Sequence, residues 1–247
     1  MSFEFLQKLP TPAEIREQYP MPEKLALLKE KRDEEIKKVI TGESDKFLVI
    51  IGPCSADNED SVCDYVNRLA AINDKVSDKC ILIPRIYWLT DVHDLLSYVA
   101  IGARSVEDQQ HRLTVSGFDV PAGMKNPTSG DLSVMMNSVY AAQHPHEFIY
   151  RNWEVKTTGN PLAHTILRGS VNQYGRNLPN YHYEDLNRLM EMYNERDLMF
   201  PATVIDANHN NSGKKYEQQV RIVKEVLHSR KSSKVNSPIP LHFGLAF

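Results

Sequence analysis

Residues 202–209 read Ala-Thr-Val-Ile-Asp-Ala-Asn-His, a short apolar run that ends in polar residues. A run of this length, rich in β-branched residues and bounded by polar ones, is typical of a buried strand. Five other stretches of the chain have the same layout. They are residues 47–54, 80–87, 98–104, 120–126 and 164–169. We therefore expect about six buried strands.

Segments with helical periodicity separate these runs. They are residues 60–76, 105–116, 132–143, 183–196 and 212–229. Strands that alternate with helices predict an α/β fold, in which a parallel sheet is covered by helices. Residues 151–158 are polar and alternating, which favours an inserted hairpin. The expected organisation is an N-terminal helical arm over 1–46, with a periodic helix at 23–40, then a β/α domain over 47–230 and a divergent tail over 231–247.

Composition restricts the class of protein and its compartment. The net charge of −3, from 29 basic and 32 acidic residues, gives no global field that would attract nucleic acid or a membrane surface. The sequence begins without the pattern of a secretory signal, and no apolar run approaches the roughly 20 residues that span a bilayer. The three cysteines, Cys54, Cys63 and Cys80, form no CxxC pair, which favours reduced thiols. We expect a cytoplasmic protein.

Cations follow several of the predicted strands. In parallel α/β folds, ligands bind where the carboxyl ends of the strands meet the loops. Arginine and lysine at such ends, with glycines beside them, suit a ligand that carries both a phosphate and a carboxylate, such as phosphoenolpyruvate. The alternative is a set of surface or salt-bridged residues. The four cations are Arg85, Arg104, Lys125 and Arg168.

Cys54 and His209 also end predicted strands, and a thiolate and an imidazole are both ligands of divalent transition metals. A lone cysteine is more often a small buried hydrophobic residue, and a lone histidine more often caps a loop. Asp57 and Asp206 are better explained as helix or loop caps than as catalytic acids. Four other histidines are weaker metal-ligand candidates. They are His111, His144, His146 and His164.

Absent motifs exclude other enzyme classes. The sequence has no GxSxG element of a serine hydrolase and no GxxxxGK[ST] loop of a P-loop NTPase. Gly52-Pro53-Cys54-Ser55 lacks the glycine spacing of a dinucleotide-binding fold.

Six motifs, taken in order and spacing, resemble class I 3-deoxy-D-arabino-heptulosonate 7-phosphate (DAHP) synthases over about residues 23–230. They are Ile50-Ile51-Gly52-Pro53-Cys54-Ser55, Ala100-Ile101-Gly102-Ala103-Arg104, Gly123-Met124-Lys125-Asn126, Gly159-Asn160-Pro161, His164-Thr165-Ile166-Leu167-Arg168-Gly169 and Asp206-Ala207-Asn208-His209-Asn210-Asn211-Ser212-Gly213-Lys214.

The resemblance implies a (β/α)₈ TIM-type barrel that condenses phosphoenolpyruvate with D-erythrose 4-phosphate, the first step of the shikimate pathway. It implies a divalent metal ion (Mn, Fe, Co or Zn) and a homo-oligomer, a dimer or tetramer. Lys125, Arg168 and His209 would be catalytic. Arg85 and Arg104 would join Lys125 and Arg168 around phosphoenolpyruvate, and Cys54 and His209 would bind the metal.

Two segments of the family pattern are absent. After Tyr87 the family continues with a Lys-Pro-Arg-Thr-Thr segment that binds the second substrate, then a helix and a strand with a glutamate; here Trp88-Leu89-Thr90-Asp91 follows. That loss is at least one βα unit, about 30 residues. Residues 229–247 also lack the family's last strand and its two carboxylate metal ligands. We therefore expect an incomplete barrel, with the apolar tail from Ile239 covering one edge.

Two hypotheses about function follow. The chain is either a DAHP synthase or a catalytically impaired or inactive remnant of that family that binds only phosphoenolpyruvate or a partner subunit.

Overall fold

A computed structural model describes residues 10–52, 58–85, 106, 108–150, 152–236 and 242–246, with only the backbone described at residues 12, 232–236 and 242–246. The chain forms two compact units, Met1–Glu35 and Ile36–Phe247.

The described part of the first unit is helical. Helix α1 (Pro12–Gln18) begins with a capping box, in which the Thr11 hydroxyl accepts from the Glu14 amide while the Glu14 carboxylate accepts from the Thr11 amide. Helix α2 (Glu23–Ile40) has the bounds expected from the periodicity and extends into the second unit. There Val39 and Ile40 are buried in a cluster with Leu48 of the sheet.

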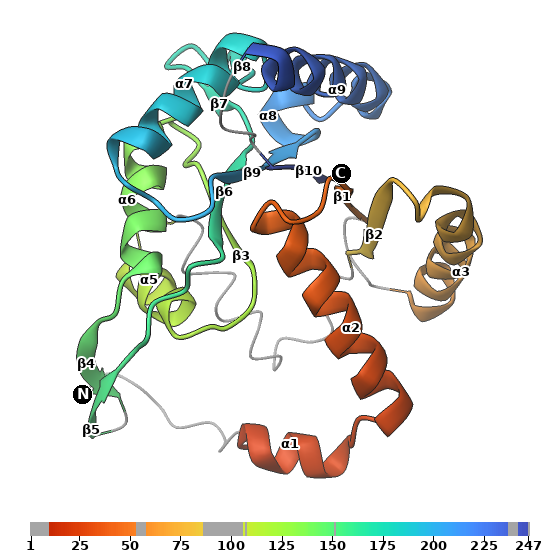
Figure 1. Ribbon diagram of the computed structural model, residues 1–247, viewed down its shortest axis with the longest axis vertical. Helices are drawn as coiled ribbons and strands as arrows, with labels where there is room; N and C mark the ends of the chain where they lie inside the picture. The colour runs from red at the N-terminus through yellow and green to blue at the C-terminus, as the bar shows by residue number, and fades with distance from the viewer. Residues whose placement is uncertain are drawn as a thin grey trace. The chain divides into compact units, whose positions relative to one another are not determined.

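The second unit is built on a six-stranded sheet in which every strand is parallel to its neighbours. The strand order is β2-β1-β10-β9-β6-β3 (Figure 1). Five strands lie inside apolar runs predicted from the sequence, with β6 starting one residue earlier. They are β1 (Phe47–Ile51), β2 (Cys80–Pro84), β3 (Ala122–Lys125), β6 (Ala163–Leu167) and β9 (Ala202–Asp206). The α/β class is therefore confirmed, while the predicted strand at 98–104 lies outside the described residues.

The sixth strand corrects one expectation. Strand β10 (His242–Ala246) comes from the tail, which was predicted to cover an edge. Instead it lies inside the sheet, between β1 and β9, with Leu48 opposite Gly244 and Ala202 opposite His242. The prediction was wrong because a strand inside the sheet pairs its backbone donors and acceptors on both sides. A strand at an edge would leave those of one side unpaired.

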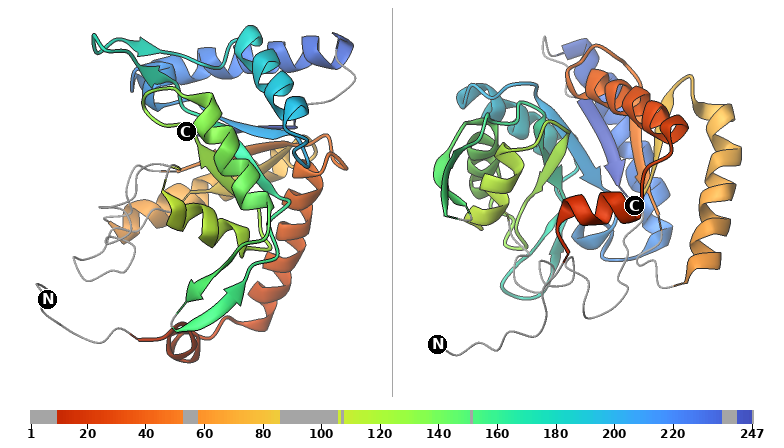
Figure 2. Two further views of the ribbon diagram at one scale, coloured as in Figure 1. Left: turned by 90° about the vertical axis from the view of Figure 1, so that its left-hand side faces the viewer. Right: turned by 90° about the horizontal axis from the view of Figure 1, so that it is seen from below.

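Helices alternate with these strands, as predicted. Three of them contribute buried apolar residues to the largest core, together with Phe47, Leu167 and Ile205 of the sheet. They are α6 (Leu132–Gln143), α7 (Tyr183–Glu195) and α9 (Gln219–Asn236), whose ribbons can be followed by colour in Figure 2. The Asp131 carboxylate caps the start of α6 by accepting from the Ser133 and Val134 amides. The helices are α3 (Glu59–Val76), α5 (Gln109–Ser116), α6 (Leu132–Gln143), α7 (Tyr183–Glu195), α8 (His209–Ser212), the 3₁₀ turn η1 (Tyr216–Gln218) and α9 (Gln219–Asn236).

Two antiparallel hairpins stand apart from the main sheet. Strands β4 (Glu147–Tyr150) and β5 (Trp153–Lys156) form the hairpin predicted near residues 151–158. A smaller one pairs β7 (Ser170–Val171) with β8 (Asn177–Leu178), directly after β6. Within the described ranges, no helix combines the length and hydrophobicity that crossing a bilayer requires.

Candidate active site

Strands β3, β6 and β9 are neighbours in the sheet (Figure 1), and each ends at or next to a polar residue. Lys125 is the last residue of β3, Arg168 directly follows β6, and Asp206 is the last residue of β9. Because the strands are parallel and adjacent, their carboxyl ends lie side by side. This is the edge at which the sequence predicted a ligand site.

Asp206 joins two of the predicted functional side chains. Its buried Oδ2 lies 2.8 Å from Nζ of Lys125 and 2.7 Å from Nδ1 of His209. Nζ of Lys125 donates a hydrogen bond to this oxygen, whereas the buried Nδ1 of His209 is close to it without hydrogen-bond alignment. Burial alone would raise the pKa of Asp206, but the contacts with His209 and Lys125 outweigh burial and lower the pKa to about 2. The carboxylate is therefore charged at neutral pH.

The expectation that Asp206 is a loop cap was incomplete. Its Oδ1 does accept a hydrogen bond from the Asn208 amide at 2.9 Å. The second oxygen, however, positions Lys125 and His209, a role that no sequence pattern near residue 206 indicated. Asp57, the other residue interpreted as a cap, lies outside the described residues.

The residues present can be compared with the needs of a divalent metal. A carboxylate next to one ring nitrogen of a histidine directs the other nitrogen towards a metal, and such pairs are common around metal sites. His209 beside Asp206 fits that pattern. In the described ranges, no three His, Cys, Asp or Glu residues gather into a metal-binding group. Cys54, the other predicted ligand, lies outside these ranges.

Lys125 and Arg168 line a common cavity of about 360 Å³. Asn126, His111 of α5 and Phe118, which follows that helix, are among the other described residues that line it. In the described part of the chain, the buried Nε of Arg168 has no hydrogen-bond partner. A buried guanidinium donor in a cavity favours an anionic ligand, because the donor otherwise stays unsatisfied.

The other two predicted cations are not placed in this cavity. Arg85 follows β2, at the far side of the sheet from β3, and its Nη2 donates to the Gly52 carbonyl at 3.2 Å. It is not among the residues that line the cavity. Arg104 lies outside the described residues. The structure thus brings together two of the four cations.

Buried amides hold the loop that carries Arg168. Oδ1 of Asn126 accepts from the Arg168 amide at 2.9 Å, and Oδ1 of Asn180 accepts from the Gly169 amide at 2.8 Å. Asn211 donates to the carbonyls of Leu167 and Asp206, at 3.1 and 2.8 Å. These contacts tie the ends of β3, β6 and β9 together.

Gly169, which directly follows Arg168, is required by the packing of two loops. Its φ is +74°, and a Cβ there would lie 2.8 Å from the backbone of Asn210 and Asn211. The glycine is needed because the loops after β6 and β9 touch at this point.

The weaker histidine candidates mostly make structural contacts. His164 is buried, and its Nδ1 lies 3.0 Å from the Leu162 carbonyl. Ring nitrogens of His144 and His146 lie 2.7 and 2.6 Å from the carbonyls of Tyr140 and Ala141. Only His111 lies beside the cavity.

Comparison with known proteins accounts for this arrangement. The family model described as "DAHP synthetase I family" matches residues 24–91 and 88–230. The chain belongs to the DAHP synthetase I family. A phospho-2-dehydro-3-deoxyheptonate aldolase of Corynebacterium glutamicum is 28% identical over 278 residues, which cover 89% of this chain and 74% of the relative.

Two further relatives extend the comparison. The Tyr-sensitive phospho-2-dehydro-3-deoxyheptonate aldolase of Escherichia coli is 28% identical over 281 residues, covering 90% of this chain and 77% of that protein. The solved structure of a phospho-2-dehydro-3-deoxyheptonate aldolase from Francisella tularensis has a TM-score of 0.79 at 22% identity, covering 97% of this chain and 85% of that one. That likeness shows the shared fold.

The match to the DAHP synthetase I family is interrupted where the sequence predicted a missing segment. Its two parts meet at residues 88–91, directly after Tyr87. The alignment to the C. glutamicum relative also contains gaps on the side of this chain, because 89% of 247 residues is about 220, fewer than the 278 aligned positions. About 58 positions of that alignment therefore have no residue of this chain.

Proposed function

We propose that this chain is a 3-deoxy-7-phosphoheptulonate synthase, an aldol-type transferase that condenses phosphoenolpyruvate with D-erythrose 4-phosphate. The enol carbon of phosphoenolpyruvate forms a bond with the aldehyde carbon of the second substrate, and with uptake of water the products are DAHP and phosphate. Membership of the DAHP synthetase I family supports the reaction. The single structural observation that carries it is the cavity shared by Lys125 and Arg168 beside the Asp206–His209 pair.

Each side chain has a role in this proposal. Arg168, with its buried Nε, binds an anionic group of phosphoenolpyruvate and holds the enol in place. The Lys125 ammonium neutralises further negative charge, so that two anionic substrates can occupy one site. Arg85 and Arg104 are proposed as additional phosphoenolpyruvate ligands at the ends of their strands.

A divalent metal is proposed at His209, held in orientation by Asp206, with Cys54 as a second ligand. When bound, such an ion polarises the aldehyde oxygen of erythrose 4-phosphate as a Lewis acid. Zn and Fe suit thiolate and imidazole ligands, whereas Mn prefers oxygen ligands; Mn and Co are proposed from the family resemblance.

The sheet is proposed to be an incomplete (β/α)₈ barrel. Six parallel strands, helices on one face and ligand groups at the carboxyl ends are features of that architecture. In the described ranges, the end strands β2 and β3 are not paired with each other. The proposed organisation remains an arm over 1–46, a β/α domain over 47–230 and a tail over 231–247, in a dimer or tetramer.

The direct test is an assay of phosphate release with both substrates and added manganese or cobalt. The proposal predicts phosphate release that requires erythrose 4-phosphate, with DAHP formed in equal amount. Phosphoenolpyruvate binding by calorimetry, run in parallel, separates the two hypotheses. Binding without turnover would support the inactive remnant, and absence of both would reject the assignment of the site.

A further inference from the structure

A second hollow lies at the opposite end of the sheet from the candidate active site. It has a volume of about 670 Å³, and an adjoining hollow of about 560 Å³ shares Asp45, Leu227 and Arg230 with it. Phe47 and Cys80, the first residues of β1 and β2, line the larger one. This cavity, hereafter the α9 cavity, is large enough for a small organic ligand.

Arg230 of α9 is the charged group inside the α9 cavity. Its side chain is only 17% exposed, and its guanidinium lies 5.4 Å from the centre of the Phe47 ring. Nη2 donates to the Asp45 carbonyl at 2.9 Å, while in the described part of the chain the buried Nε has no hydrogen-bond partner. Burial lowers the pKa of Arg230, because the charged guanidinium is partly withdrawn from water, although Asp45 acts in the opposite direction.

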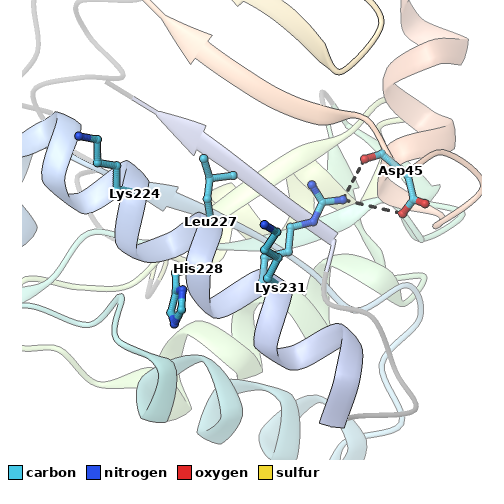
Figure 3. A pocket seen from close by; sticks show the side chains of 6 residues that line it. Asp45, Lys224, Leu227, His228 and Lys231 are labelled. Atoms are coloured by element: carbon cyan, nitrogen blue, oxygen red, sulfur yellow. Dashed lines mark hydrogen bonds and ion pairs between the residues drawn. The ribbon is translucent and has the colours of Figure 1, made fainter.

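Among the described residues, the carboxylate that pairs with Arg230 compensates this charge weakly. Oδ1 of Asp45 is 3.9 Å from Nη2, and the Asp45 side chain is 87% exposed (Figure 3). An ion pair that long and that exposed contributes little. A ligand carboxylate at Nε would therefore add a charge-assisted hydrogen bond that the protein itself leaves unmade.

The rest of the lining is apolar inside and basic at the rim. Apolar contacts come from β1 and α9, through Phe47, Val49, Val223 and Leu227. Figure 3 shows Lys224, Leu227 and Lys231 along α9, with Asp45 beside them. The two hollows together are lined by five cations and two carboxylates. These are Lys46, Lys79, Lys224, Arg230 and Lys231, against Asp45 and Asp78.

We propose that the α9 cavity binds a small organic anion, a molecule with one carboxylate on an apolar ring or chain. The carboxylate accepts from Nε of Arg230, and the apolar part lies on Phe47 and Leu227. The excess of cations at the rim disfavours a neutral or cationic molecule of the same shape. This site is separate from the proposed phosphoenolpyruvate site, because it lies at the amino ends of the strands.

The test uses the full chain and naphthalene-2-carboxylate as the probe, with the uncharged naphthalene-2-carboxamide as its matched neutral form. Calorimetry should show binding of the acid with a Kd below about 1 mM, and at least about 10-fold weaker binding of the amide. A saturating amount of phosphoenolpyruvate should leave the affinity unchanged. Equal affinity for acid and amide, or displacement by phosphoenolpyruvate, would overturn the proposal.

Variants locate the binding. Arg230→Gln should weaken binding of the acid about 10-fold or more, while Arg188→Gln, at an exposed position of α7, should not. Arg230 also contacts Asp45, so a second variant leaves Arg230 unchanged. Leu227→Glu places a negative charge in the lining and should weaken binding of the acid. Val220→Glu is its control, since Val220 is 62% exposed on the same helix and lines neither hollow. Equal effects of the two glutamates, or an unchanged Kd in Arg230→Gln, would reject the site.

Discussion

At the scale of single residues, Arg168 is the cation whose surroundings are best suited to an anion. Its Nε is buried without a hydrogen-bond partner among the described residues, and its residue lines the cavity that Lys125 also lines. Asn126 and Asn180 hold the backbone of residues 168 and 169, so the side chain starts from a fixed point.

Arg168→Ala should weaken phosphoenolpyruvate binding by about 10- to 100-fold, the value of one or two charge-assisted hydrogen bonds. Calorimetry with phosphoenolpyruvate measures the change, and Arg188→Ala, at an exposed position of α7, is the matched control. An affinity equal to that of the unaltered protein would show that the cavity is not the phosphoenolpyruvate site.

Asp206 should act on two partners at once. Asp206→Asn keeps the shape but removes the charge that Lys125 and His209 share. We expect metal affinity to fall by about 10- to 100-fold, as for other partners of metal-binding histidines. Phosphoenolpyruvate should also bind more weakly, because Lys125 loses its fixed position.

The measurements for Asp206→Asn are metal titration by calorimetry and, separately, phosphoenolpyruvate binding without metal. Asp119→Asn, at an exposed position, serves as the control. A loss of metal affinity alone would mean that Asp206 does not position Lys125.

At the scale of elements, the loops after β6 and β9 depend on their contact at Gly169. Gly169→Ala should destabilise the protein because φ is +74° and the added Cβ would lie 2.8 Å from the Asn210 and Asn211 backbone. Gly175 is a closely matched control, since its φ of +76° is nearly the same but nothing lies within 4 Å of an added Cβ.

Gly175→Ala should cost only the backbone strain, about 1–2 kcal/mol, and Gly169→Ala at least about 2 kcal/mol more, as expected for an overpacked site. Urea unfolding followed by circular dichroism measures both free energies. Similar losses in the two variants would mean that the loops can separate at little cost.

At the scale of the whole molecule, the buried His164 should make the free energy of unfolding depend on pH. Burial lowers its pKa from the ordinary value of 6.5, although the Leu162 carbonyl acts in the opposite direction. Between the lowered pKa and 6.5, the unfolded chain binds the proton and the folded chain does not. His164 therefore stabilises the fold fully above pH 6.5, and this contribution is lost as the pH falls towards the lowered pKa.

His164→Asn keeps a donor for the Leu162 carbonyl and removes the titration. The difference between denaturant curves at pH 7.5 and 5.5 should therefore be smaller in this variant than in the unaltered protein. An unchanged pH dependence would contradict the assignment of this acid sensitivity to His164.

The sequence by itself determined most of the strands and helices, and it indicated that the site lies at the carboxyl ends of the strands. Alternating apolar runs and periodic segments specify strands and helices locally, and the residue after an apolar run must lie at the end of its strand. Lys125 and Arg168 could be proposed for this reason, whereas His209 lies three residues beyond the end of β9, as the first residue of α8. The break after Tyr87 was likewise visible in the order of motifs, and the match to the DAHP synthetase I family divides there.

Only the tertiary structure decided which strands are neighbours. Strand β10 lies between β1 and β9, where its backbone donors and acceptors find partners on both sides. The distance along the sequence does not reveal which strands will pair. The same neighbour relations place Asp206 on β9 within reach of Lys125, 81 residues earlier on β3. The partners of a carboxylate depend on distances in space. An aspartate that caps a loop and one that positions a lysine and a histidine therefore cannot be distinguished in the sequence.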